Sequence, residues 1–291
     1  MKISIITPTY NRAHTLSRCF ESLMKQNYDD FEWIIVDDGS TDDTQKLVKE
    51  MIKNSKFKIK YLYQKNQGKH VAHNLAVLNA EGELTVCVDS DDYLLESTLN
   101  KISNYWNRNK DESYIGIVAK RGDKQLNPIC SNLPKIKSCT MYELSHTYNV
   151  KGDTVLFYKT DLLKKELFKI FTKEKFLAEC SLYFLLDSYG KMLIIDEVMY
   201  IGEYLEDGLT KKFHKLLMDN PKGSAYCYKV YYDNSKGFNK IKYAILYNAY
   251  RSLIDDYNEK VKDRDLLIKI TRLLGYIYMK KYNKRGKNEK I

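Results

Sequence analysis

The sequence predicts an α/β fold with a mainly parallel central sheet, followed by a C-terminal helical extension. Two observations predict this fold. Short apolar runs alternate with single amphipathic segments through the first hundred residues, an order that produces right-handed βαβ units and parallel strands. The apolar runs also end in polar or acidic loops. Because the carboxyl ends of parallel strands share one edge of a sheet, these loops are expected to converge there.

The predicted strands are apolar, rich in β-branched residues, and closed by a proline, an acidic cluster or a turn. They are Lys2–Pro8, Phe31–Val36, Lys58–Tyr63 and Leu84–Val88. Between them, apolar residues at helical spacing predict three helices, the first capped by Thr15 and the second beginning near Thr44. Their apolar faces are Leu16, Cys19, Phe20, Leu23 and Met24, then Leu47, Val48 and Met51, then Val71, Leu75 and Leu78.

The second half of the chain follows a looser pattern, and residues 122–138 predict a loop because Gly, Asn and Pro occur there without periodicity. The predicted elements are a helix carrying Leu95, Leu99, Ile102 and Trp106, strands at Ile115–Ala119, Thr154–Tyr158 and Met192–Ile195, a short helix from Thr160, and a helix carrying Leu182, Leu185 and Leu186. From Phe238 onward two helical stripes follow: Ile241, Ile245, Ala249 and Leu253, then Leu266, Leu267, Ile270, Leu273, Leu274, Ile277 and Tyr278.

The central stretch is Leu84–Tyr93, where an apolar strand runs directly into the carboxylates Asp89, Asp91 and Asp92. Like charges this close repel unless a cation or a donor-rich partner lies among them. In extended backbone, Asp89 and Asp91 point the same way and share one ligand. Hard oxygen donors favour Mg²⁺ or Mn²⁺ together with substrate phosphates. The alternative is a polar turn with solvated charges.

Composition excludes several classes of protein. The 291 residues are 44% hydrophobic and 30% charged, which predicts a globular chain. No apolar run is long enough to span a membrane, and Pro8 interrupts the N-terminal apolar run too early for a signal peptide. The six cysteines are scattered without a Cys-x-x-Cys pair, which argues against a zinc site and predicts reduced thiols in the cytoplasm.

The net charge of +10 is concentrated in the tail, because residues 236–291 contain 15 Lys and Arg against 6 Asp and Glu. A basic amphipathic helix with aromatic edges is typical of a membrane surface. The alternative is that the helices pack on the catalytic domain with solvated lysines, and the two are compatible. No recognition motif supports binding of nucleic acid.

Four motifs together resemble the family-2 glycosyltransferases of the GT-A fold. They are Thr7-Pro8-Thr9-Tyr10-Asn11-Arg12, Val36-Asp37-Asp38-Gly39-Ser40-Thr41-Asp42, Gly68 with Asn74, and Asp89-Ser90-Asp91-Asp92. The resemblance is strong over the first 100 residues and looser over the next hundred. It implies a GT-A nucleotide-binding domain with a nucleotide-sugar half at 1–100, an acceptor half at 101–212, and a basic helical extension at 213–291.

The resemblance also implies a donor site for a nucleotide-sugar, expected to be a UDP-sugar. Pro8 and Tyr10 would flank the base, and Asp38 would accept from the uracil imide, although Asp38 could instead cap the next helix. Lys69 after Gly68 would neutralise the diphosphate, or be an ordinary exposed lysine. Mn²⁺ or Mg²⁺ would be held by Asp91 and Asp89. The full set of donor residues is Thr7, Pro8, Thr9, Tyr10, Arg12, Asp38, Gly68, Lys69, Asp89 and Ser90.

For the catalytic base the resemblance implies an acidic pair near Glu179, but Cys180 stands where a second acid is expected. Glu179 is the predicted base and Glu174 the reserve, while the alternative is that Glu179 complements a helix dipole. His70, His73 and His214 are weaker predictions as metal ligands. The resemblance also implies two features of the acceptor side. Gly152 with Asp153 would lie beside the acceptor pocket, or form a plain turn, and Glu206 and Asp207 would lie on a closing loop at its rim.

These features predict an inverting glycosyltransferase that moves a sugar from a UDP-sugar to a hydroxyl acceptor in polysaccharide or glycolipid synthesis. The alternative is a catalytically inactive nucleotide-sugar-binding subunit that tethers a partner at the membrane. The expected partners are the donor, a hydroxyl acceptor such as a lipid-linked glycan, the inner face of the membrane through the basic tail, and a second copy of the chain. A sugar-phosphate nucleotidyltransferase is disfavoured because no glycine-rich loop follows the first strand.

Overall fold

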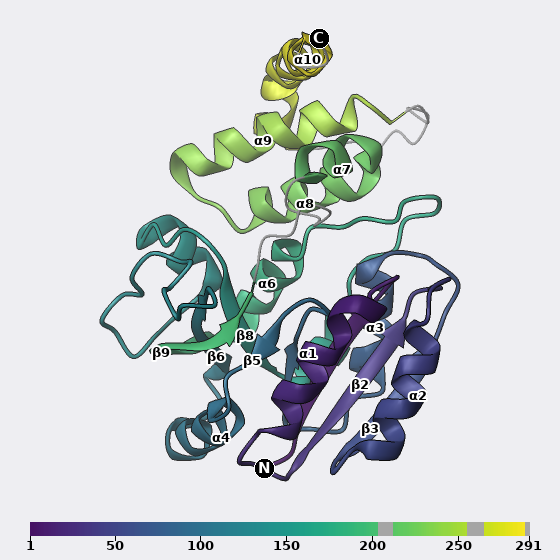
Figure 1. The fold of residues 1–291 in the computed structure, drawn as a ribbon. Helices are drawn as coiled ribbons and strands as arrows, with labels where there is room; N and C mark the ends of the chain where they lie inside the picture. The colour runs from purple at the N-terminus through teal and green to yellow at the C-terminus, as the bar shows by residue number, and fades with distance from the viewer. Residues whose placement is uncertain (203–211, 255–264, 289–291) are drawn as a thin grey trace. The chain divides into compact units, whose positions relative to one another are not determined.

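The structure is a computed structural model that describes residues 1–202, 212–254 and 265–288 (Figure 1). It divides into two units. The first comprises Met1–Phe168 with Leu186–Leu205, and the second comprises Lys169–Leu185 with Glu206–Ile291. Each unit is described by itself below.

The first unit is built on one sheet with the strand order β3-β2-β1-β4-β8-β6-β9-β5, and β7 pairs with β9. Neighbours β3, β2, β1 and β4 are parallel, β8 runs antiparallel to both β4 and β6, and β6 and β9 are parallel. The bounds are β1 Ile3–Thr9, β2 Phe31–Asp37, β3 Lys58–Tyr63, β4 Leu84–Cys87, β5 Tyr93–Leu94, β6 Tyr114–Gly122, β7 Ser138–Cys139, β8 Thr154–Lys159 and β9 Lys191–Ile201.

The order of the strands creates a switch point beside β1. The chain runs from β1 outward to β2 and β3, then crosses back to place β4 on the other side of β1. The loops after β1 and β4 therefore lie at the switch point on the carboxyl edge, where α/β sheets bind their ligands. The predicted α/β fold is confirmed, and its four N-terminal strands match their predicted positions within one residue.

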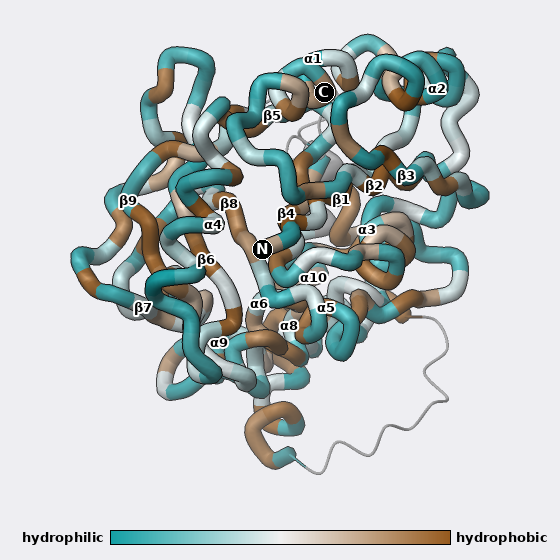
Figure 2. The backbone as a smooth tube through the Cα atoms, turned by 90° about the horizontal axis from the view of Figure 1, so that it is seen from below, coloured by the Kyte–Doolittle hydropathy of each residue, from teal (hydrophilic) through white to brown (hydrophobic). Residues whose placement is uncertain are grey.

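Helices lie in the connections between the strands of this sheet (Figure 1). All seven residues of β1 and of β2 are buried, as expected for strands covered on both faces. Along the tube in Figure 2, β6 and β9 carry hydrophobic stretches, and the core includes Trp33, Trp106 and Phe157. The helices are α1 Ala13–Met24, α2 Thr44–Asn54, α3 Lys69–Leu78, α4 Thr98–Asn109 and α5 Thr160–Lys165, with single turns at Glu143–Thr147 and Asp187–Tyr189.

Some local predictions are wrong. Thr15 is not a cap, because α1 already begins at Ala13 and the Thr15 hydroxyl donates back to the carbonyl of Arg12. Strand β9 continues well beyond the predicted end at Ile195. Ala119 of β6 pairs with Ile195 and Lys120 with Val198, so the two acids between them form a bulge and do not end the strand.

The second unit is helical, with α6 Cys180–Leu186 ending at its border with the first unit, α7 Phe213–Asp219, α8 Pro221–Asp233, α9 Gly237–Arg251 and α10 Leu266–Asn288. Its core is rich in tyrosine. The buried face of α9 includes Tyr243, Ala244, Tyr247 and Tyr250, whereas Ile241 of the predicted stripe is 41% exposed. Of the other stripe residues, Ala249 is fully buried and Ile245 and Leu253 are half-buried, so the predicted stripe covers only part of the packing face, which the tyrosines complete.

Helix α10 packs on α9 through the buried residues Ile268, Thr271, Gly275 and Met279. A Cβ atom on Gly275 would lie 2.6 Å from the Asn248 side chain, so only glycine allows this approach. The Asn248 amide donates to the carbonyl of Ile268 at 2.8 Å and to the Thr271 hydroxyl at 3.1 Å. Most of the predicted Leu and Ile stripe lies on the exposed side of α10, and Leu267 is half-buried against the core. Across the described residues, the helices are either too short or too polar to cross a bilayer.

Candidate active site

Loops after β1 and β2 interlock at the carboxyl edge of the sheet. The backbone N–H of Asp38 donates to the carbonyl of Thr9 at 2.8 Å. Asn11 has a positive φ of 52°, and its side-chain oxygen accepts from the N–H of Thr41 at 2.8 Å. Asparagine is among the residues that tolerate this left-handed conformation. The two loops are therefore tied to each other at the carboxyl edge.

The three carboxylates after β4 converge as predicted, but through a turn. Strand β4 ends at Cys87, and the N–H of Asp92 donates to the carbonyl of Asp89 at 3.0 Å. One ligand atom from each of Asp89, Asp91 and Asp92 lies within 4.8 Å of the others. The premise of an extended Asp89–Asp91 backbone is thus wrong, because the turn brings the acids together. We call residues 89–92 the acid turn.

Asp92 anchors the acid turn from inside. Its carboxylate is 1% exposed and accepts from the Arg121 guanidinium and from the Tyr200 hydroxyl, each at 2.7 Å. The Tyr200 oxygen also accepts from the backbone N–H of Asp89 at 3.0 Å. Burial and the charge of Asp89 raise the pKa of Asp92 despite the opposing charge of Arg121. Arg121 and Tyr200 therefore fix the acid turn from β6 and β9.

Asp89 and Asp91 are less buried than Asp92 and lie among cations. The Nζ of Lys69, at the start of α3, is 2.6 Å from Oδ1 of Asp89. Burial, followed by the negative charge of Asp89, raises the pKa of Asp91, while Arg12 and Lys69 oppose the shift. This crowding of negative charge favours a divalent cation. Carboxylate oxygens are the donors that Mg²⁺ and Mn²⁺ prefer, so the residues fit the predicted ion.

Asp38 holds the loop before α3. Its Oδ1 accepts from the Gln64 amide at 2.7 Å and from the N–H of Gln67 at 2.8 Å. Its Oδ2 accepts from the Asn66 amide at 3.1 Å and from the N–H of Gly68 at 2.8 Å. A carboxylate has about four acceptor sites, and all are used here. Asp38 therefore positions Gly68 and Lys69, a role that the sequence analysis did not predict.

The remaining predicted donor residues differ in accessibility. Thr7 is fully buried, and its hydroxyl accepts from the Trp33 indole at 2.9 Å, so a direct side-chain contact with the donor does not fit. Pro8, Thr9 and Ser90 are also buried. Tyr10 is 48% exposed at the rim, where a ring has room to stack on a base.

The two predicted bases lie in the helical unit and have different partners. Glu174 accepts from the backbone N–H groups of Lys222 at 2.8 Å and Gly223 at 2.7 Å, so both its oxygens serve the start of α8. Glu179 directly precedes α6, is half-buried, and accepts from the Tyr183 hydroxyl at 3.1 Å. Glu179 is therefore the stronger candidate, because Glu174 is used as a helix cap.

Cys180 does not replace the missing acid. Burial raises the pKa of its thiol, and the sulfur contacts the Tyr231 hydroxyl. The thiol thus stays protonated at neutral pH.

The histidine predictions gain no support from the described acid turn, which contains carboxylates only. His70 is 4% exposed, and burial lowers its pKa. The His73 ring packs edge-on against Phe168 at 4.9 Å. His214, in the helical unit, lies 6.0 Å from the Tyr282 ring. Glu206 and Asp207 lie outside the described residues.

Arg121 and Tyr200 are the site residues that the sequence analysis missed. The Arg121 guanidinium also lies 5.0 Å from the Tyr200 ring centroid and 3.8 Å from the Asp153 carboxylate. A Cβ atom on Gly202 would lie 2.1 Å from this guanidinium. One signal was available: Lys120 and Arg121 directly follow the apolar run 115–119, as the acids follow β4. Asp153, predicted beside the acceptor pocket, is thus linked to the acid turn through Arg121.

A comparison with protein families decides the assignment. The model of glycosyl transferase family 2 matches residues 4–162, more than half of the chain. The chain belongs to glycosyl transferase family 2.

Relatives of this family 2 chain are bacterial glycosyltransferases. An uncharacterised one from Nostoc sp. is 28% identical over 173 residues, 57% of this chain and 53% of the relative. TarS of Staphylococcus aureus, a poly(ribitol-phosphate) β-N-acetylglucosaminyltransferase, is 39% identical over 101 residues, 34% of this chain and 18% of TarS. GlyA of Streptococcus pneumoniae is 30% identical over 183 residues, 58% of this chain and 25% of GlyA. The chain spans about half or less of the length of these curated relatives.

Solved structures place this family 2 chain in the GT-A fold, as predicted. Residues 1–349 of S. aureus TarS in complex with UDP-GlcNAc match with a TM-score of 0.64 at 21% identity, covering 94% of this chain and 79% of that one. The mannosyltransferase PcManGT from Pyrobaculum calidifontis, in complex with GDP-Man and Mn²⁺, matches with a TM-score of 0.59 at 15% identity, covering 86% and 72%.

Proposed function

We propose that this family 2 glycosyltransferase is an inverting enzyme that transfers a sugar from a UDP-sugar to a hydroxyl acceptor in polysaccharide or glycolipid synthesis. The acid turn at the carboxyl edge of a GT-A sheet carries the proposal. Residues 1–100 would hold the donor, residues 101–212 the acceptor, and residues 213–291 form the basic extension. The complex of TarS with UDP-GlcNAc supports a uridine nucleotide as the donor.

On the donor side, Tyr10 stacks on the base and Lys69 neutralises a phosphate of the diphosphate. Asp38 holds Gly68 with φ 101°, a conformation that suits glycine, and so sets the start of α3. Helix N-termini favour anions. The Lys69–Asp89 ion pair keeps the lysine at this edge.

For the metal, Asp91 and Asp89 would hold Mn²⁺ or Mg²⁺. The bound ion would supply charge stabilisation for the departing diphosphate, an effect worth several kcal/mol. PcManGT in complex with Mn²⁺ supports this assignment. Asp92 remains paired with Arg121 and hydrogen-bonded to Tyr200, and it thereby positions Asp89 and Asp91.

For the chemistry, Glu179 removes the proton of the acceptor hydroxyl. The acceptor oxygen attacks the anomeric carbon from the face opposite UDP, and the bond from that carbon to the UDP oxygen breaks. UDP leaves with the bonding electrons, so the configuration is inverted. A positioned general base contributes about 10²–10⁴-fold.

A second candidate function is a catalytically inactive nucleotide-sugar-binding subunit. Cys180 favours this candidate, because it stands where the family resemblance implies a second acid. A protonated thiol in contact with the Tyr231 hydroxyl cannot replace that carboxylate. Release of UDP from UDP-sugars in Mn²⁺ separates the two candidates. Turnover that falls in Glu179→Gln while UDP still binds supports the enzyme. Tight binding of UDP-sugars without hydrolysis or transfer across a panel of acceptors supports the inactive subunit and overturns the proposal.

A further inference from the structure

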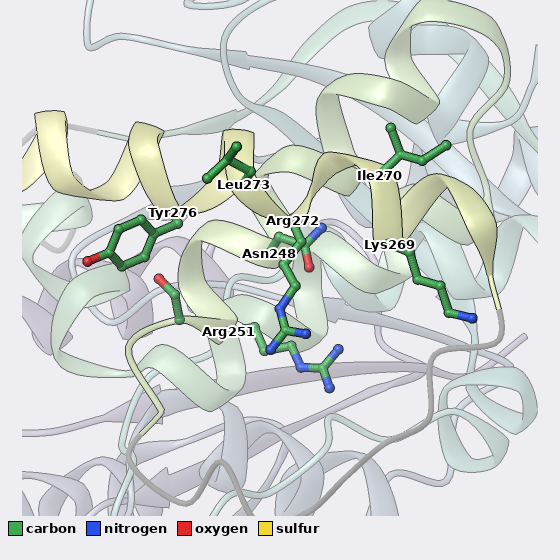
Figure 3. A pocket seen from close by; sticks show the side chains of 8 residues that line it. Asn248, Arg251, Lys269, Ile270, Arg272, Leu273 and Tyr276 are labelled. Atoms are coloured by element: carbon green, nitrogen blue, oxygen red, sulfur yellow. The ribbon is translucent and has the colours of Figure 1, made fainter.

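The helical unit contains a basic pocket of about 570 Å³ between α9 and α10 (Figure 3). Its cations are Arg251 from α9 and Lys269 and Arg272 from α10. The other lining residues are the polar Asn248, Ser252 and Tyr276 and the apolar Ile270 and Leu273. The volume lies within the range of about 300–1,000 Å³ that is usual for small-ligand sites. Three cations together with the Tyr276 hydroxyl suit a phosphate group.

The pocket is positioned by the packing of α10 on α9. Asn248 donates to the carbonyl of Ile268 and to the Thr271 hydroxyl, which fixes the register of the two helices. Gly275 lies against α9 so closely that a Cβ atom would be 2.8 Å from the backbone nitrogen of Ala249. The cations of the pocket are therefore presented by a defined helix pair.

An exposed apolar stripe borders the pocket on α10. Its members are spaced three or four residues apart, so they share one helix face. They are Leu266, Ile270, Leu273 and Ile277, with exposures of 69%, 65%, 67% and 41%. In Figure 3, Ile270 points away from Arg272. Two of the stripe residues, Ile270 and Leu273, also line the pocket, so basic and apolar surfaces are continuous there.

The charge of α10 points to an anionic occupant. The helix has seven Lys and Arg residues and no acid over its 23 residues. Pairing this face with itself would bring like charges together, which disfavours a second copy of the chain. Exposed leucine and isoleucine contribute little to binding a sugar-phosphate backbone. A bilayer with anionic head groups accepts both the cations and the apolar stripe.

We propose that the pocket between α9 and α10 binds the phosphate of an anionic lipid while the apolar stripe enters the bilayer surface. Arg251, Lys269 and Arg272 hold the phosphate. Tyr276, at the edge of the pocket, lies at the level of the head groups, where tyrosine is favoured. This site does not depend on the glycosyl transfer reaction, so its test needs neither donor nor acceptor.

The test is co-sedimentation of the full chain with vesicles. Vesicles containing phosphatidylglycerol are expected to bind the chain, and vesicles of phosphatidylcholine alone are not. The variant Lys269→Gln/Arg272→Gln should weaken binding by at least about tenfold, since each cation at an anionic surface contributes strongly. Both side chains are exposed, so the fold should persist. A second variant, Ile270→Ser/Ile277→Ser, should weaken binding through the stripe.

The matched control is Lys236→Gln/Lys242→Gln, which removes the same charge from exposed positions outside the pocket. It should change binding by less than about threefold. Equal losses in the control and pocket variants would overturn the phosphate site. The proposal also fails if inorganic phosphate stabilises the wild type but vesicles do not bind. It fails equally if light scattering shows a dimer that Ile270→Ser/Ile277→Ser dissociates and vesicles do not bind.

Discussion

The hydroxyl of Tyr200 donates a 2.7 Å hydrogen bond to the buried carboxylate of Asp92. The same oxygen accepts from the backbone N–H of Asp89. A single hydroxyl from β9 thus joins both ends of the acid turn. Arg121 from β6 supplies the compensating charge. The acid turn is thus held by the strands behind it, while Asp89 and Asp91 are half-buried.

Removing this hydroxyl should loosen the acid turn. In Tyr200→Phe, a buried N–H and a buried carboxylate lose a partner, at a cost of about 1–3 kcal/mol in the free energy of unfolding. Urea denaturation measures the loss. The control is Tyr189→Phe, because that hydroxyl donates to Glu166 at the surface and should cost less than about 0.5 kcal/mol. Equal effects of the two substitutions would contradict the anchoring role.

Removing the charge partner of Asp92 should cost more. Arg121→Met leaves a buried carboxylate uncompensated, so the free energy of unfolding should fall by about 3–5 kcal/mol. Adding Asp92→Asn in the same chain should recover part of this loss. A double-mutant cycle measures the coupling. Additive losses would mean that the two residues do not stabilise each other.

The two glutamates of the helical unit should separate into different roles. Glu179→Gln should lower kcat for transfer by about 10²–10⁴-fold with little change in UDP affinity. Glu174→Gln should leave kcat within a few-fold and lower the free energy of unfolding by about 1 kcal/mol, because a cap of α8 is weakened. Steady-state kinetics and urea denaturation of both variants provide the measurements. The assignment is reversed if Glu174→Gln is the variant without turnover.

Asp187 should make stability depend on pH. Its carboxylate accepts from the N–H groups of Met141 and Tyr142, and burial raises its pKa from 3.8 to about 6. Because the folded state binds this proton more tightly, the contribution to stability is full below about pH 4 and is lost as the pH rises through 6. Relative to Asp187→Asn, the wild type should lose up to about 3 kcal/mol between pH 4 and pH 7. A constant difference between the two proteins across this range would contradict the shift.

Much of the first unit could be predicted because its signals are local. Runs such as Phe31–Val36 are apolar, rich in β-branched residues and bounded by acids. A few adjacent residues are therefore enough to predict the strand, the helix after it and the loop at the carboxyl edge of the sheet. The convergence of Asp89 and Asp91 was also predicted, but from an extended backbone, whereas a turn produces it. The contacts of Arg121 and Tyr200 could not be predicted, because they depend on the pairing of β6 with β9. Asp92 and Tyr200 are 108 residues apart in the chain.

The helical unit shows a different limit. The apolar stripe of α10 is evident from the sequence, but the face that packs on α9 is not, because it is formed by Ile268, Thr271 and Gly275. Close approach of two helices selects small residues, and hydropathy does not report this. The pocket beside Arg251 and Arg272 depends on that approach. Hydrophobic periodicity alone therefore could not predict this pocket.

In the proposed function, the acid turn binds a divalent cation and, through this cation, the diphosphate of the donor. Calorimetric titration of UDP in Mn²⁺ and in EDTA, with wild type and Asp91→Ala, tests it most directly. The claim predicts that EDTA weakens UDP binding to wild type by at least about tenfold, and that Asp91→Ala binds UDP weakly in both conditions while remaining folded. Asp91→Ala that binds UDP as tightly as wild type in Mn²⁺ would contradict the claim.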